Sequence, residues 1–110
     1  MAILANLFID QGTDFSITVD VTDSNGEILN MSGYYSAGQI RKTYESSTVS
    51  ATFTTSISAA AGQVTLSLND TVTSALGAGR YVYDLNVTSS GGVTTRVVEG
   101  QAIVTPGVTR

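Results

Sequence analysis

Apolar and polar residues alternate with a period of two along much of this chain. The clearest run covers residues 15–21, where Ser, Thr and Asp separate the apolar residues Phe15, Ile17, Val19 and Val21. Successive side chains of a β-strand point to opposite sides, so this period places all four apolar side chains on one face. The run predicts a strand with one face in a core and the other in solvent.

The sequence contains six further short runs that predict strands, and turn residues such as Asp-Ser-Asn-Gly and Ser-Ser-Gly-Gly separate them. They cover residues 3–9, 34–42, 51–57, 64–68, 81–87 and 93–105. The helical pattern is confined to one short turn, which Asn69 or Asp70 would cap and Gly77 would close. We therefore expect an all-β protein in which two antiparallel sheets form a sandwich, and a small barrel is the alternative.

A Gly-Ala-Gly corner leads into the run at 81–87. Leu76 ends the turn before the corner, Gly79 completes it, and Tyr81 and Tyr83 begin the run. In immunoglobulin-type sandwiches a tyrosine at this place buries its ring and turns its hydroxyl back onto the corner backbone. We therefore predict an immunoglobulin-like antiparallel β-sandwich of about seven strands, with Leu76, Gly79, Tyr81 and Tyr83 as its structural corner and both rings in the core.

The last run changes parity partway along. Val93, Thr95 and Val97 share one parity, whereas Val98, Gly100, Ala102 and Val104 share the other. One inserted residue near 97–99 would let both sets face inward, so we predict a β-bulge there. Pro106 ends the sheet, and we interpret residues 1–110 as a single sandwich domain with a tail at 106–110.

The composition removes several classes of function. The chain has no Cys and no His, which leaves no thiolate or imidazole for catalysis or for zinc. The net charge is −4, and residues 1–30 hold five acids and no base, so no basic stripe suggests binding to nucleic acid. The apolar run at 3–9 is too short to span a bilayer, and we expect no membrane partner.

Two acidic groups are candidate sites. Asp23 to Glu27 place oxygen groups at alternate positions, as calcium loops do, but they lack the distal bidentate glutamate, and an acidic turn is the alternative. Asp84 and Glu99 lie on runs that could be neighbours, although Arg80 or Arg96 could pair with Asp84. We expect no metal, no cofactor and no catalytic residue, and hence no enzyme.

Two sets of residues are candidates for a contact surface. Tyr35, Arg41 and Tyr44 combine the residue types that binding surfaces favour, although they are also ordinary residues for a sheet face. Leu4 and Phe8 share one side of the first run, while Ile3, Leu7 and Ile9 share the other. A lone monomer would leave one of these sides exposed, so we expect a homo-oligomer or a particle-bound chain with contacts at 1–9 and 106–110.

Several stretches carry a resemblance to known proteins. They are Phe15-x-Ile17-x-Val19-Asp20, the Asp-Ser-Asn-Gly turn, and the stretches at 29–34, 39–42 and 78–85. Together they resemble small virion structural proteins of tailed bacteriophages, including marine cyanobacterial phages. They are also similar to the immunoglobulin-like N-terminal domain of phage baseplate upper proteins.

The resemblance implies a non-enzymatic protein that decorates a capsid or builds part of a tail or baseplate. Such a protein is made in the host cytoplasm, resides in the virion, and has other virion proteins as partners. The alternative is a carbohydrate- or host-surface-binding immunoglobulin-like module, in which Tyr35, Arg41 and Tyr44 would contact sugar rings.

Overall fold

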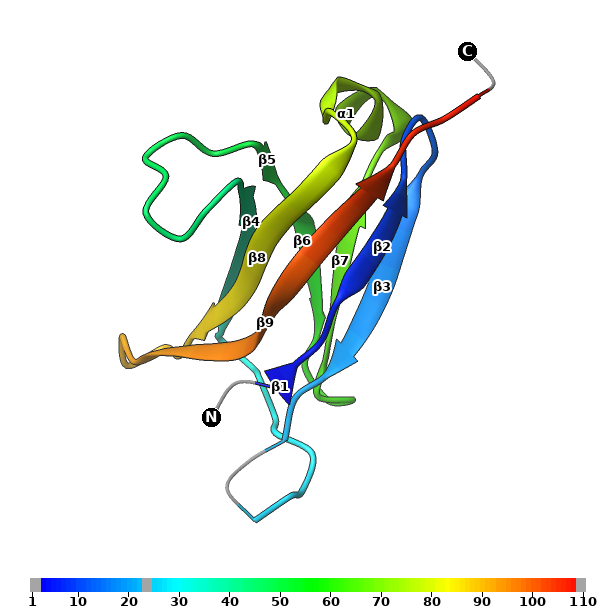
Figure 1. Cartoon of the computed structure of the whole chain (residues 1–110). Helices are drawn as coiled ribbons and strands as arrows, with labels where there is room; N and C mark the ends of the chain where they lie inside the picture. The colour runs from blue at the N-terminus through cyan, green and yellow to red at the C-terminus, as the bar shows by residue number, and fades with distance from the viewer. Residues whose placement is uncertain (1–2, 23–24, 109–110) are drawn as a thin grey trace.

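Two β-sheets pack face to face in the computed structural model, which describes residues 3–22 and 25–108 (Figure 1). The larger sheet runs in the order β1 (Ile3–Leu4), β9 (Thr94–Thr105), β8 (Gly79–Thr88), β4 (Tyr35–Arg41) and β5 (Ala51–Thr52), and β2 (Leu7–Asp10) also pairs with β9. The smaller sheet runs in the order β3 (Phe15–Asp20), β7 (Gln63–Leu68) and β6 (Thr54–Ser58). The helix α1 (Asp70–Ala75) lies between β7 and β8 in the chain.

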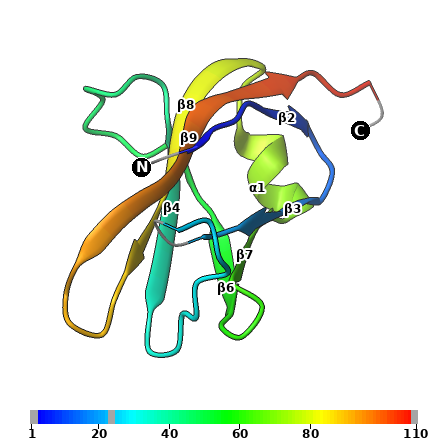
Figure 2. The same cartoon turned by 90° about the horizontal axis from the view of Figure 1, so that it is seen from below.

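The predicted β-sandwich is confirmed. Seven strands of the described chain have four residues or more, and β9, β8 and β4 face β3, β7 and β6 in two layers (Figure 2). Apart from the first segment, this arrangement is that of the immunoglobulin fold, in which the third, sixth and seventh main strands form one sheet and the second, fourth and fifth belong to the other. The inward side chains share one core, whose fully buried members include Ile9, Ile40, Leu66 and Leu85.

The expectation of purely antiparallel sheets is wrong at one edge. The run predicted at 3–9 divides into β1 and β2, and both strands pair in parallel with β9. All other strand pairs in the described chain are antiparallel. Residue spacing could not reveal this, because a period of two is the same for either direction of pairing.

The first strand is interrupted at Ala5 and Asn6, where the Ala5 backbone lies over Gly100 of β9, and we call this place the crossing. The Ala5 N–H donates to Glu99 O over 2.8 Å, and the Asn6 side chain accepts from the Gln101 N–H over 3.1 Å. A Cβ on residue 100 would meet the Ala5 carbonyl, so only glycine fits beneath the crossing. The buried hydroxyl of Tyr83, which lies opposite Gly100, donates to Ala5 O over 2.6 Å.

The corner before β8 has the predicted geometry. The Tyr81 ring is buried, and its hydroxyl donates to Gly77 O over 2.7 Å. Leu76 is buried as well, and Gly79 has a φ of 145°, which disfavours any residue with a Cβ. This is the tyrosine corner of immunoglobulin-like sandwiches.

Helix α1 connects the corner to the turn between β2 and β3. Asn69 is its N-cap, with the side chain accepting from the Val72 N–H over 2.9 Å. The helix ends at Ala75 with Leu76 as its C-cap, but Gly77 does not close it as a left-handed glycine would, because Gly77 does not have a positive φ. The buried Thr73 hydroxyl donates to Thr13 O over 2.7 Å, which fixes the helix against the turn.

The predicted bulge in the last strand is present, but its effect on the side chains differs. Leu85 pairs with Val98 whereas Asn86 pairs with Arg96, so Val97 is the inserted residue. The insertion does not turn the earlier residues inward, since Val93 is 66% exposed and Val97 is only half-buried.

The run predicted at 51–57 is divided between the two sheets at Phe53. β5 belongs to the larger sheet and β6 to the smaller one, and the Phe53 N–H donates to Gly38 O over 2.9 Å. The buried Phe53 ring meets Tyr83 edge to face, with centroids 6.1 Å apart. Gly38 gives room to the side chains of Phe53 and Leu66.

The crossing at Gly100 predicts that one methyl group added at this position lowers the stability of the fold. Gly100→Ala forces the Ala5 carbonyl away from β9, and we expect a loss of about 1–3 kcal/mol in the free energy of unfolding. Gly91→Ala is the control, because an added Cβ there meets nothing closer than 3.8 Å, and it should change stability by less than about 0.5 kcal/mol. Urea denaturation measures both, and equal effects of the two substitutions would contradict this account of the crossing.

Candidate functional site

The outer face of the first two strands exposes large apolar side chains. Leu4 is 77% exposed and Phe8 is 67% exposed, whereas Leu7 and Ile9 of the same segment are buried. Phe8 pairs with the half-buried Ile103 of β9, so the two side chains share a face. We call Leu4, Phe8 and Ile103 the N-terminal edge. It is an apolar strip at one border of the larger sheet.

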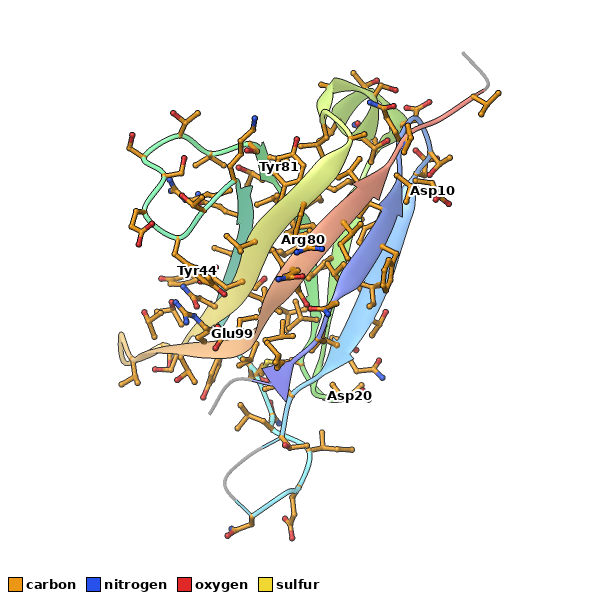
Figure 3. The ribbon with its side chains drawn as sticks, in the orientation of Figure 1. Asp10, Asp20, Tyr44, Arg80, Tyr81 and Glu99 are labelled. Carbon is orange, nitrogen blue, oxygen red and sulfur yellow. The ribbon has the colours of Figure 1, made fainter. Side chains whose placement is uncertain are left out.

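A hollow of about 230 Å³ lies on the outer face of the larger sheet. We call it the outer hollow, and its lining includes Gln39, Arg41, Tyr44, Asp84, Asn86 and Arg96. The loop after β4 fixes one of its groups, because Arg41 donates through Nη1 to Ser46 O over 2.7 Å and through Nη2 to Gln39 Oε1 over 3.0 Å. Figure 3 shows Tyr44 and Glu99 on this side of the molecule. The hollow thus combines an exposed aromatic ring with oriented polar groups.

The two acids weighed as a pair lie directly opposite each other on β8 and β9. Asp84 pairs with Glu99 in the sheet register, and Arg96 binds both. Its Nε lies 3.2 Å from Asp84 Oδ2, and its Nη1 lies 3.6 Å from Glu99 Oε1. Of the two arginines that could pair with Asp84, Arg96 does so, whereas Arg80, which lies four residues before Asp84 on β8 and opposite Ile103, is exposed. The guanidinium makes this group a fixed ion-pair network.

The structure does not gather the predicted aromatic surface into one place. Tyr35 and Arg41 stand at opposite ends of β4, and six residues at roughly 3.3 Å each place them about 20 Å apart. Tyr35 is 70% exposed and lies outside the outer hollow, whereas Arg41 and Tyr44 both line it. Tyr35 and Arg41 lie on the same face of β4, as their shared parity predicts, but the length of the strand keeps them apart.

Asp23 and Ser24 of the possible calcium turn lie outside the described residues. The turn itself reverses the chain, since Thr22 bridges Ile28 and Gly26 has a φ of 81°. Among residues 3–22 and 25–108, no three Asp or Glu side chains converge as metal ligands would. No helix in that part of the chain has both the length and the apolar character needed to cross a bilayer.

Sequence reasoning missed a second hollow of about 260 Å³, which opens between the two sheets on the side of β2 and β3. We call it the lateral cleft, and its lining includes Ala5, Leu7, Ile17, Val19, Leu66 and Val98. All of these residues occupy the alternating positions of their segments that face the core. The cleft depends on which strand the first segment joins, and no residue pattern carries that information.

No protein-family model matches the chain, and no curated protein matches its sequence.

The buried hydroxyl at the crossing has an altered acidity. Burial raises the pKa of Tyr83 from 10.0 to about 12, because the phenolate would lose its hydration. The folded state therefore holds this proton more tightly than the unfolded state. The contribution to stability is complete below pH 10 and is lost as the pH rises from 10 to about 12.

We predict that Tyr83→Phe separates the two roles of this side chain. At neutral pH it should lower the free energy of unfolding by about 1–2 kcal/mol, because the carbonyl of the half-buried Ala5 loses its donor. Between pH 10 and about 12 the variant should lose less stability than the wild type, since it lacks the titrating group. Tyr35→Phe, which changes an exposed ring, is the control. Urea denaturation across this pH range would contradict the assignment if both variants followed the wild-type decline.

Proposed function

We propose that this chain is a non-enzymatic structural component of a phage virion, as a capsid decoration or as part of a tail or baseplate, and that it acts through protein–protein contacts. The exposure of Leu4 and Phe8 along one border of the larger sheet carries the proposal. The resemblance of the strand and corner motifs to phage virion proteins supplies the particle context. Homo-oligomers and other virion proteins are the partners that we propose.

The N-terminal edge is suited to a permanent contact. Buried large apolar side chains are worth about 1.5–3 kcal/mol each relative to exposed ones, so two of them on one strip favour association. β2 is also a border strand, and its free side has no neighbour in the larger sheet among the described strands. Unprotected strand borders with apolar side chains are common points of pairing between chains. A subunit in a particle would cover both features at once.

We predict that the double variant Leu4→Ser and Phe8→Ser loses assembly without losing its fold. Both side chains point into solvent, so the melting temperature should change little, whereas self-association in sedimentation velocity and incorporation into particles should be lost. Val93→Ser is the matched control, because Val93 is 66% exposed in the hairpin between β8 and β9.

The decisive comparison uses mass spectrometry of purified particles made with each form of the chain. The wild type and the Val93→Ser control should be present in the particles. The proposal fails if the wild type is abundant in lysates but missing from particles, and the assignment to the N-terminal edge fails if the double variant enters them normally.

The outer hollow favours a second candidate function, which is binding of a carbohydrate on the host surface. Tyr44 offers an exposed ring face for a sugar, and Arg41, Asp84 and Asn86 offer donors and acceptors for its hydroxyl groups. The ion pairs of Arg96 hold part of this lining in place before a ligand arrives, which reduces the ordering cost of binding.

We predict that Tyr44→Ala abolishes any glycan binding, whereas Tyr35→Ala leaves it unchanged. The two tyrosines are similarly exposed, at 62% and 70%, but only Tyr44 lines the outer hollow. A glycan array with the wild type identifies the sugar, and titration of both variants then locates its site. Absence of binding by the wild type at millimolar sugar would remove this candidate, and equal losses in the two variants would remove the outer hollow as its site.

A further inference from the structure

The strand β3 borders the smaller sheet and has one unpaired side. Among the described strands it pairs with β7 alone, because β1 and β2 join β9 in the other sheet. The Val21 N–H donates to Gly62 O over 2.7 Å, so residues of this parity direct their backbone groups toward β7 and its turn. By the alternation of an antiparallel ladder, the backbone groups of Ser16, Thr18 and Asp20 face away from β7.

The two lateral sides of the sandwich differ. On the side of β4 and β6 the sheets are joined, since the chain passes from β5 into β6 at Phe53 and Ser36 donates to Thr55 Oγ1 over 2.8 Å. On the side of β2 and β3 the lateral cleft opens instead. Ile17 and Val19 have inward parity yet are only half-buried there. An added strand beside β3 would cover them and bring its own inward side chains to the cleft.

The charges at the two ends of β3 indicate what kind of strand would fit. Asp14 directly precedes the strand and Asp20 ends it, and Figure 3 shows Asp20 at the end of β3 that lies near β1. In a pair of β3 strands from two copies, the antiparallel order would bring Asp14 of one copy close to Asp20 of the other. Like charges placed opposite each other destabilise strand pairs, so a second β3 is disfavoured. A strand with a basic residue near each end would be favoured.

We infer that the border of β3 and the lateral cleft accept an extended strand from a partner protein, with alternating apolar side chains and basic residues at its ends. The main-chain groups of Ser16, Thr18 and Asp20 would bind the partner's backbone, and the cleft would take an apolar side chain. The inference rests on the proposed role in protein–protein contact and assigns it a second surface, separate from the N-terminal edge.

The test uses a defined probe, which is a short synthetic peptide in which valine and threonine alternate and lysine stands at each end. The same peptide with glutamate at each end is its control. Amide NMR spectra of the full chain during titration report both affinity and location. We expect the lysine peptide to bind, with shifts at Ser16, Thr18 and Asp20, and the glutamate peptide to bind more weakly.

Two variants of the chain separate backbone pairing from charge. Thr18→Pro removes an outward N–H from a border strand, where proline is tolerated, and should abolish binding of the lysine peptide. Asp20→Lys should lower the affinity for the lysine peptide about twofold to fivefold, as expected for the loss of one exposed ion pair. It should raise the affinity for the glutamate peptide by a similar factor. Glu45→Lys makes the same charge change in the loop after β4 and should alter neither affinity. If Thr18→Pro does not fold, the shift of Asp20→Lys from the lysine peptide toward the glutamate peptide still tests the inference.

The inference is overturned if the shifts lie outside β3 and the cleft, if folded Thr18→Pro binds as tightly as the wild type, or if Asp20→Lys leaves the peptide preference unchanged. Self-association that Thr18→Pro abolishes would also overturn it, because a second copy would then occupy the border. The Leu4→Ser and Phe8→Ser variant should bind the peptide normally. A failure of the N-terminal edge in assembly and a failure of β3 in peptide binding are therefore measured separately.

Discussion

The hydrogen bond from the Tyr83 hydroxyl to Ala5 O is the interaction on which the arrangement of this sandwich depends. Ala5 lies over Gly100 of β9, where any side chain would strike its carbonyl, and Tyr83 reaches the same carbonyl from β8. A hydroxyl donor in the core keeps the carbonyl paired although the strand ladder is interrupted there. The crossing thereby holds the first segment against β9 on both sides of the break.

This attachment determines which surfaces are free. With the first segment paired in parallel to β9, Leu7 and Ile9 fill the core while Leu4 and Phe8 face outward. The same pairing leaves β3 without a second neighbour in the smaller sheet. The apolar N-terminal edge and the open border of β3 are therefore two consequences of one choice of strand partner. A first segment paired with β3 would have closed the lateral cleft and removed the free border.

The sequence was sufficient for the features that depend on local patterns. Alternation located the strands, the corner residues located the Tyr81 hydrogen bond, and the parity change in the last run located the bulge at Val97. It was insufficient wherever the outcome depended on contacts between distant segments. The parallel pairing of β2 and the change of sheet at Phe53 both follow from topology. An alternating run specifies a buried face and leaves the partner strand undetermined.

Hydrogen bonds to α1 fix the turn that precedes β3, and this bears on how the border could act. Thr73 accepts from the Gly12 N–H over 3.1 Å and donates to Thr13 O, and Asp14 accepts from the Asp70 N–H over 2.8 Å. These bonds fix the turn before β3 to a helix that is itself held by the tyrosine corner. A border strand that is ordered before it meets a partner loses little conformational entropy on pairing, so the pairing energy goes largely into affinity. The corner and the crossing, both built on tyrosines of β8, thus support the border of the opposite sheet as well as the core between them.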